Sequence, residues 1–260
     1  MDRLENLKNI IMYLMADEHV SHRIPSTLEE RQRMMRALMN VWEPRPIAED
    51  FLTMQDAELQ MQCEDKGVVG LENVAAANYS LFTFHSSLLL WQGDITRLKV
   101  DAIVNAANAQ ALGCWSPLHN CIDNSIHSAA GIQLRQECAD KMQGRLLATG
   151  DAFITQGYNL PARHVIHTVG PIIPDGIPTK EKEEQLAQCY HSCLDLAEQN
   201  GLESIAFCCI STGVFHFPNE LAARIAIETV KSYPRHALKT IVFNVFLDKD
   251  RDIYQQLLGA

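Results

Sequence analysis

Residues 91–131 read WQGDITRLKVDAIVNAANAQALGCWSPLHNCIDNSIHSAAG and contain two strand-like runs, a polar loop and the beginning of a helix. The loop carries three side chains of metal-binding type, Cys114, His119 and Cys121. Soft ligands, small residues and carboxamides are concentrated here more than a simple connection between two elements requires. We therefore interpret this loop as an active site around which the rest of the chain is organised.

Two thiols and an imidazole favour zinc among the common cytosolic metals. A structural zinc usually has four protein ligands, whereas three ligands and an open fourth position are typical of a catalytic zinc. In a minor alternative, His127 is a fourth ligand that closes the site. On spacing alone, incidental thiols are an equal alternative to a metal centre.

Carboxylate and carboxamide side chains flank this loop. Asp123 begins the following helix, either as its N-cap or as a general base beside the metal, and the two roles are compatible. Asn105 and Asn108 follow a strand, where asparagine either caps a turn or hydrogen-bonds the hydroxyls of a sugar. Local sequence does not choose between these roles.

Beyond the loop, short apolar runs alternate with amphipathic segments. The pattern predicts strands at 88–91, 102–104, 151–155, 164–168, 204–210 and 241–246, and helices at 123–142, 180–200, 219–233 and 248–258. Such alternation predicts an α/β domain with helices on both faces of the sheet. Residues 1–85 are predicted to be a mostly helical N-terminal extension of an α/β domain at 86–260, and residues 26–29 have the form of a capping box.

Two further loops follow predicted strands. Asp94 and Ile95 lie in a segment that is either a turn or a contact for adenine. The loop after the strand at 204–210 consists of Ser211, Thr212, Gly213, Val214 and Phe215. Its glycine allows close approach of the backbone, and its N–H groups are suited to a phosphate. Open α/β sheets bind ligands at the ends of several strands, so these loops together predict one binding site.

The composition and the missing motifs exclude several classes of function. A formal charge of −10 over 260 residues argues against binding to a nucleic-acid backbone. No apolar run approaches the roughly 20 residues of a membrane span, and the N-terminus has the wrong flanks for a signal peptide, so we expect a cytoplasmic protein with no membrane partner and free thiols. Dinucleotide-binding, P-loop, zincin and serine-hydrolase motifs are absent from the sequence.

Taken together, the motifs resemble those of macrodomains, specifically the zinc-containing class of microbial ADP-ribosyl hydrolases. The matching segments are GDIT at 93–96, DAIVNAAN at 101–108, GCxxPxHxCIDNxIH at 113–127, AAG at 129–131, TGD at 149–151, HVIH at 164–167 and STGVF at 211–215. Metal-free macrodomain hydrolases carry a glycine run where this chain has 114–121. The resemblance implies a three-layer α/β/α macrodomain with a mixed central sheet, and a helical N-terminal extension also occurs in this class.

The resemblance also implies roles for individual residues. Asp94 would contact the adenine amino group, with Ile95 beside it. Asn108 would bind the distal ribose and, with Asp123, take part in catalysis. Cys114, His119 and Cys121 would hold one Zn²⁺ per chain. The remaining implied ADP-ribose contacts are Cys121, Ile122 and Asp123 on the ribose and diphosphate side, and Ser211, Thr212, Gly213, Val214 and Phe215 around the phosphates and distal ribose.

The function implied by the resemblance is zinc-dependent removal of mono-ADP-ribose from modified proteins, which is a glycosidase-type hydrolysis. Two alternatives use the same pocket, namely an ADP-ribose-binding reader without catalysis and an O-acetyl-ADP-ribose deacetylase. A structural zinc is a further alternative. The implied partner is a lipoyl-carrier-type protein modified by a sirtuin-like transferase, although no residue of this chain identifies it.

Overall fold

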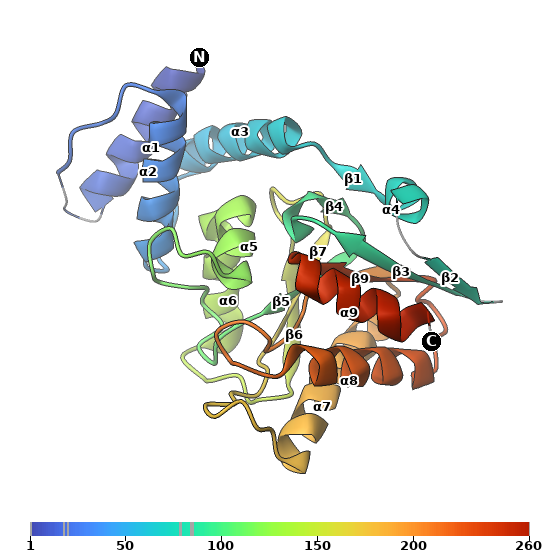
Figure 1. The fold of residues 1–260 in the computed structure, drawn as a ribbon. Coiled ribbons are helices and arrows are strands. Elements are labelled where there is room, and N and C mark those ends of the chain that lie inside the picture. Colours follow the sequence, from blue (N-terminus) through green and yellow to red (C-terminus); the bar gives the residue numbers. More distant parts are fainter. Residues whose placement is uncertain (1, 18, 20, 78–79, 84–85, 260) are drawn as a thin grey trace.

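A seven-stranded sheet forms the centre of the protein. The computed structural model describes residues 2–17, 19, 21–77, 80–83 and 86–259. The strand order is β2-β3-β9-β8-β5-β7-β6 (Figure 1). The strands are β2 (Ser80–Thr83), β3 (Ser86–Gln92), β5 (Ala102–Ala106), β6 (Ala152–Gln156), β7 (His164–Thr168), β8 (Ser204–Phe207) and β9 (Thr240–Val245). The inner strands are parallel, and β2 and β6 are antiparallel to their neighbours at the two edges. The expected mixed sheet is therefore confirmed.

Helices cover both faces of this sheet. They are α5 (Ile122–Ala130), α6 (Ile132–Met142), α7 (Lys180–Gln199), α8 (Asn219–Ser232) and α9 (Asp248–Gly259). The connections from β7 to β8 and from β8 to β9 step along the sheet in one direction, whereas the connection from β5 to β7 steps in the other. Because connections between parallel strands are right-handed, α7 and α8 cover one face, and α5 and α6 cover the opposite face. The last helix, α9, packs against α8 (Figure 1).

The direction in which the chain steps along the sheet reverses between β5 and β8. These strands are neighbours, but the chain leaves β5 toward one face and β8 toward the other. Loops that diverge in this way leave a gap outside the carboxyl ends of the strands, which is where open α/β sheets bind ligands. The loop with the metal-type side chains follows β5, and residues 211–215 follow β8.

The N-terminal extension has its own apolar core. Helix α1 (Arg3–Asp17) packs against α2 (Leu28–Val41) and α3 (Glu49–Lys66). Leu7, Ile10, Ile11 and Leu14 recur at helical spacing on α1 and are fully buried in this cluster. Ile132 of α6 belongs to the same cluster, so the extension is packed onto the α/β domain. Figure 1 shows α2 next to α5.

A short segment joins the extension to the sheet. It contains β1 (Val69–Gly70), which pairs with β4 (Leu98–Lys99), and α4 (Leu71–Ala77). A 3-10 helix, η1 (Ile95–Arg97), precedes β4. The predicted boundary at residue 85 falls on residues outside the described part of the chain. Strand β2 lies before that boundary and pairs with β3 in the central sheet.

Two predicted details of the helices were wrong. Thr27, rather than Ser26, caps α2, because the Thr27 side chain accepts the N–H of Glu30 and its hydroxyl donates to the Glu30 carboxylate. The single helix predicted at 123–142 is two helices, because Gly131 has a φ of 103° and interrupts the helical path. Among the described residues, no helix combines the length and apolarity needed to cross a membrane.

Candidate active site

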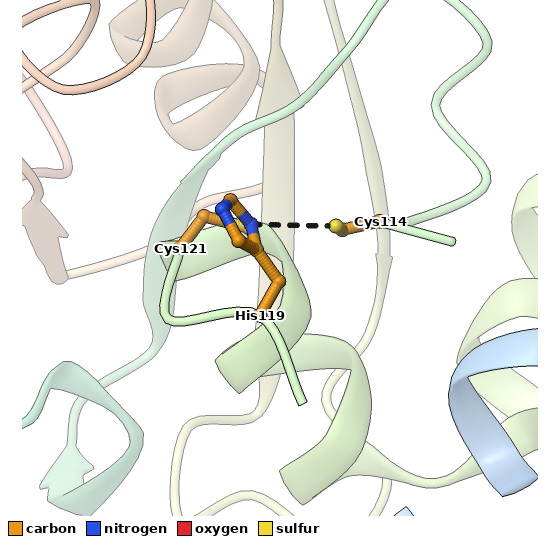
Figure 2. Close-up of side chains that lie close together, drawn as sticks. All are labelled: Cys114, His119 and Cys121. Carbon is orange, nitrogen blue, oxygen red and sulfur yellow. Dashed lines mark hydrogen bonds between the residues drawn. The ribbon is translucent and has the colours of Figure 1, made fainter. Parts of the chain in front are cut away.

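The three metal-type side chains come together at the surface, as predicted. Their ligand atoms all lie within 4.8 Å of one another, and Cys114 Sγ lies 3.6 Å from His119 Nδ1 (Figure 2). Zinc bonds of about 2.3 Å to sulfur and about 2.0 Å to nitrogen, at a tetrahedral angle, separate two such ligands by roughly 3.6 Å. Both thiols are half-buried and the imidazole is exposed, so solvent reaches the cluster. The residues present therefore fit a zinc ion with a fourth position open to water.

The start of α5 positions Cys121. The Sγ atom of Cys121 accepts the N–H of Asn124 at 3.4 Å, and this thiol is the N-cap of the helix. The prediction that Asp123 is the N-cap was therefore wrong, because the cap lies two residues earlier. Burial raises the pKa of the Cys121 thiol to about 11, so binding of a metal at neutral pH must displace a proton.

Asp123 lies in a buried position behind this cluster. It is 5% exposed, and its Oδ1 accepts the side-chain N–H of Asn105 at 2.8 Å. Its other oxygen lies 3.4 Å from the donor Nδ2 of Asn108. Burial raises the pKa of Asp123 to about 6, and the hydrogen bond from Asn105 opposes that shift. The carboxylate remains mostly ionised at neutral pH, so it is able to accept a proton.

Asn105 has neither of the roles that its local sequence suggested. It lies within β5, is fully buried, and donates to Asp123 rather than facing a ligand. Asn108 is half-buried and accepts the backbone N–H groups of Gln110 and Ala111, so it holds the turn. Its Nδ2 donates to the Gly113 carbonyl at 3.1 Å, which joins this turn to the beginning of the metal loop.

His127 does not contribute to the surface cluster. It is 4% exposed and lies in a second group of ligand-type side chains with Cys138 and His167, all of them buried. Its Nε2 lies 3.6 Å from Asp123 Oδ1, and within the described residues neither of its ring nitrogens makes a hydrogen bond. The idea of His127 as a fourth ligand to the Cys-His-Cys centre was therefore wrong, since its ring faces the interior.

Asp94 lies on the side of the site next to the extension. Its Oδ1 accepts the N–H and the hydroxyl of Thr96, which caps η1. Its Oδ2 lies 3.5 Å from Nζ of Lys66, the last residue of α3, while Ile95 is buried. Asp94 also lines a cavity of about 380 Å³ between α2, α3 and α5. The extension thus forms a wall beside the residue expected to meet adenine.

The loop after β8 has an unusual backbone. Ser211 has a φ of 65° and His216 a φ of 58°, a region that residues other than glycine seldom adopt. Ser211 is buried, whereas Gly213 and Val214 are exposed and Thr212 and Phe215 are half-buried. Gly170 packs against Ser211, since a Cβ at Gly170 would lie 1.9 Å from the Ser211 hydroxyl. The tight packing holds the loop in place after the carboxyl end of β8.

Three side chains around the metal loop were not predicted from sequence. Arg36 and Asn40 belong to α2, and Arg135 belongs to α6; all three hydrogen-bond to the loop or to its neighbours. The partners in these bonds are 21 to 83 positions apart in the chain. No local pattern marks such residues, because only tertiary packing brings them to the loop.

Comparison with known proteins agrees with this geometry. Residues 104–226 match the model of the Macro domain family. A protein-ADP-ribose hydrolase of Staphylococcus aureus is 44% identical over 98% of this chain and 97% of its own length. A protein-ADP-ribose hydrolase of Treponema medium is 46% identical over 96% of this chain and 97% of its own length.

Solved structures show the same architecture. The Oceanobacillus iheyensis macrodomain with ADP has a TM-score of 0.64 and 36% identity, and the match covers 70% of this chain and 95% of that one. The Trypanosoma brucei macrodomain in complex with ADP-ribose has a TM-score of 0.64 and 30% identity, over 86% of this chain and 95% of that one. This chain belongs to the macrodomain family, and it is a hydrolase.

Proposed function

We propose that this protein is a zinc-dependent hydrolase that removes mono-ADP-ribose from modified proteins. The observation that carries the proposal is the Cys114–His119–Cys121 cluster at the carboxyl end of β5, immediately before the buried carboxylate of Asp123. The curated relatives are named protein-ADP-ribose hydrolases, and two of the related macrodomain structures contain ADP or ADP-ribose. The loops after β3, β5 and β8 surround the place where such a nucleotide would bind.

A zinc ion held by Cys114, His119 and Cys121 would supply Lewis acidity to an oxygen atom in its open position. The chain itself supplies the groups that orient the reaction. Asp123 would take a proton from the attacking water, and the hydrogen bond from Asn105 would hold the carboxylate in position. Water then adds its hydroxyl to the anomeric carbon of the distal ribose, and the protein side chain leaves with a proton.

The remaining contacts would bind the rest of ADP-ribose. The exposed residues Gly213 and Val214 would offer their backbone N–H groups to the diphosphate, and the N-terminus of α5 at Ile122 would also favour an anion. Asp94 would accept the adenine amino group through the oxygen that Lys66 approaches. Asn108 would face the distal ribose from the turn that it stabilises.

A turnover assay on a mono-ADP-ribosylated protein tests this proposal. The forms compared are metal-replete enzyme, chelator-treated enzyme and Asp123→Ala, with Asp140→Ala as the matched control because Asp140 is an exposed carboxylate on α6. We expect chelation and Asp123→Ala each to slow release of ADP-ribose by about 100-fold or more, and Asp140→Ala to leave it unchanged.

Each contrary result identifies a different alternative. Full turnover after chelation, or in metal-free Cys114→Ala, would remove zinc from the chemistry, and unfolding on chelation would make the zinc structural. Binding of ADP-ribose without release from any form would make the protein a reader. A larger kcat/KM for O-acetyl-ADP-ribose than for a modified protein would identify a deacetylase.

We further propose that the modified protein is of the lipoyl-carrier type and is modified by a sirtuin-like transferase. The support is the resemblance to the zinc-containing class alone. Equal rates of release from a modified lipoyl carrier and from an unrelated modified protein would contradict this choice of substrate.

A further inference from the structure

We propose that helix α2 of the N-terminal extension is part of the metal centre, in which Arg36 and Asn40 hold the loop around His119 and so set its affinity for Zn²⁺. The inference rests on the zinc proposed above. It assigns a function to the extension, in which the sequence shows no catalytic cluster. Both residues are positioning residues, since neither supplies a ligand atom to the metal.

Asn40 contacts the loop at its most constrained residue. Leu118, next to the ligand His119, has a φ of 59°, which costs a residue with a side chain roughly 1–2 kcal/mol. The Oδ1 atom of Asn40 accepts the N–H of Leu118 at 2.9 Å, while its Nδ2 donates to Ser128 of α5 at 3.0 Å. Asn40 is 1% exposed, so water does not compete for these bonds. A left-handed residue next to the ligand is therefore fixed by a side chain of the extension.

Arg36 contacts the ligand residue itself. Its Nη2 donates to the backbone carbonyl of His119 at 3.1 Å and to Oδ1 of Asn124 at 2.7 Å. Asn124 in turn donates through its side chain to the Ser116 carbonyl at 3.0 Å, and its backbone N–H donates to Cys121 Sγ at 3.4 Å. One guanidinium therefore links α2 to the backbone of one ligand and to the residue that holds another.

The third ligand residue, Cys114, is linked to α2 through Arg135 of α6. Arg135 is 2% exposed and donates to the carbonyls of Met39, Asn40 and Trp42 at the end of α2. Its Nη2 also lies 3.4 Å from the Cys114 carbonyl, and its guanidinium lies 4.1 Å from the centre of the Trp115 ring. The end of α2 and the beginning of the metal loop thus share one buried cation.

These contacts matter because the loop has few other constraints. Ser116, Pro117, His119 and Asn120 are exposed. Without α2, the exposed part of the loop around His119 would have to be ordered by the metal itself, and that entropy cost would reduce the affinity. Groups that orient metal ligands typically contribute about 10- to 100-fold in metal affinity.

The test measures Zn²⁺ affinity by competition with a chromogenic chelator, using the full chain. Arg36→Ala and Asn40→Ala are compared with Arg33→Ala, which removes an exposed arginine one turn earlier on the same helix. We expect the first two to bind Zn²⁺ about 10-fold or more weakly, and Arg33→Ala to remain within about two-fold of the unsubstituted protein. Thermal unfolding of the zinc-free forms verifies that each variant is folded.

Arg36→Lys provides a second variant with the charge retained. Lysine cannot bond His119 and Asn124 with the same planar fork, so we expect weaker Zn²⁺ binding here too. Folded Arg36 and Asn40 variants with unchanged affinity would overturn the inference, as would an equal loss in Arg33→Ala. If the unsubstituted protein itself binds no Zn²⁺, the metal role in the proposed function fails as well, so the two failures are distinguishable.

Discussion

Among the described residues, two clusters of cysteine and histidine side chains lie in opposite surroundings, one with two thiols and the other with two imidazoles. Cys114, His119 and Cys121 lie at the surface, whereas His127, Cys138 and His167 are all buried, and in each cluster the ligand atoms lie within 4.8 Å of one another. The side-chain types alone do not distinguish the two. What differs is access to water and the bonds that each group already makes.

The buried cluster is suited to packing rather than to a metal. Burial raises the pKa of the Cys138 thiol and lowers the pKa of His167 to about 3, so both groups are neutral. His167 Nε2 lies 3.0 Å from the Thr155 hydroxyl, Nδ1 lies 3.2 Å from Asn105 Nδ2, and the ring stacks on Phe153. A dication there would require a thiolate in the interior, which is costly to desolvate. That cost is smaller in the surface cluster, whose thiols are only half-buried.

The largest expected effect separates the clusters by metal content. Cys121→Ala should lose the single bound zinc, because it removes a thiolate ligand, whereas Cys138→Ala should retain one zinc per chain. Metal analysis after dialysis measures both. Zinc retained by Cys121→Ala but lost from Cys138→Ala would place the metal in the interior.

Acid should destabilise the protein through the buried cluster. His167 is neutral in the fold with a pKa near 3, against an ordinary value of 6.5, so the unfolded chain takes up the proton first. The stabilisation that this shifted pKa gives the folded protein is complete above pH 6.5. It is lost as the pH falls toward 3, which lowers the free energy of unfolding by up to about 5 kcal/mol. In urea unfolding of the zinc-free proteins, the free energy of unfolding should fall less steeply between pH 6 and 4 for His167→Gln than for the unsubstituted protein. The exposed His119→Gln is the control, and an equal change of slope there would refute the assignment to burial.

Gly113 connects the two clusters, and a methyl group there should disturb both. It precedes Cys114, has a φ of 81°, and a Cβ would lie 2.8 Å from Cγ of the His127 ring. We expect Gly113→Ala to reduce the free energy of unfolding by about 3 kcal/mol, from backbone strain and overpacking together.

Gly144→Ala tests the effect of backbone strain without overpacking. Gly144 has a φ of 76°, but its Cβ would meet nothing within 4 Å. Only the conformational cost of roughly 1 kcal/mol is expected there. Chemical denaturation of the two variants gives the difference, and equal losses would show that contact with His127 is unimportant.

The smallest expected effect concerns one hydrogen bond. Thr155→Val keeps the shape of the side chain and removes the hydroxyl beside His167 Nε2. We expect a loss of about 1–2 kcal/mol in unfolding free energy, because the buried nitrogen keeps only the weaker contact with Cys138 Sγ at 3.8 Å, with no change in Zn²⁺ affinity. A weaker zinc site in this variant would mean that the clusters are coupled.

The residue pattern alone predicted six of the seven strands of the sheet and the helices that cover it, but not β2, which lies in the segment expected to be mostly helical. Alternating apolar runs predicted β7 at its observed bounds and most other elements to within a few residues, because burial on a sheet requires apolar side chains whatever their partners. The Cys-His-Cys cluster was also predictable, since its members lie within eight positions and a short loop keeps them close. The break at Gly131 was missed because apolar periodicity continues across it.

Tertiary structure decided which polar groups meet. Asn105 and His127 were both considered as ligand-facing side chains, yet packing of α5 on β5 turns them inward, around Asp123. Arg36, Asn40 and Arg135 reach the metal loop only because α2 docks on α5 and α6 through a separate apolar core. The physical reason is range: backbone propensity and periodicity act over a few residues, whereas hydrogen bonds between distant segments depend on the docking of whole helices.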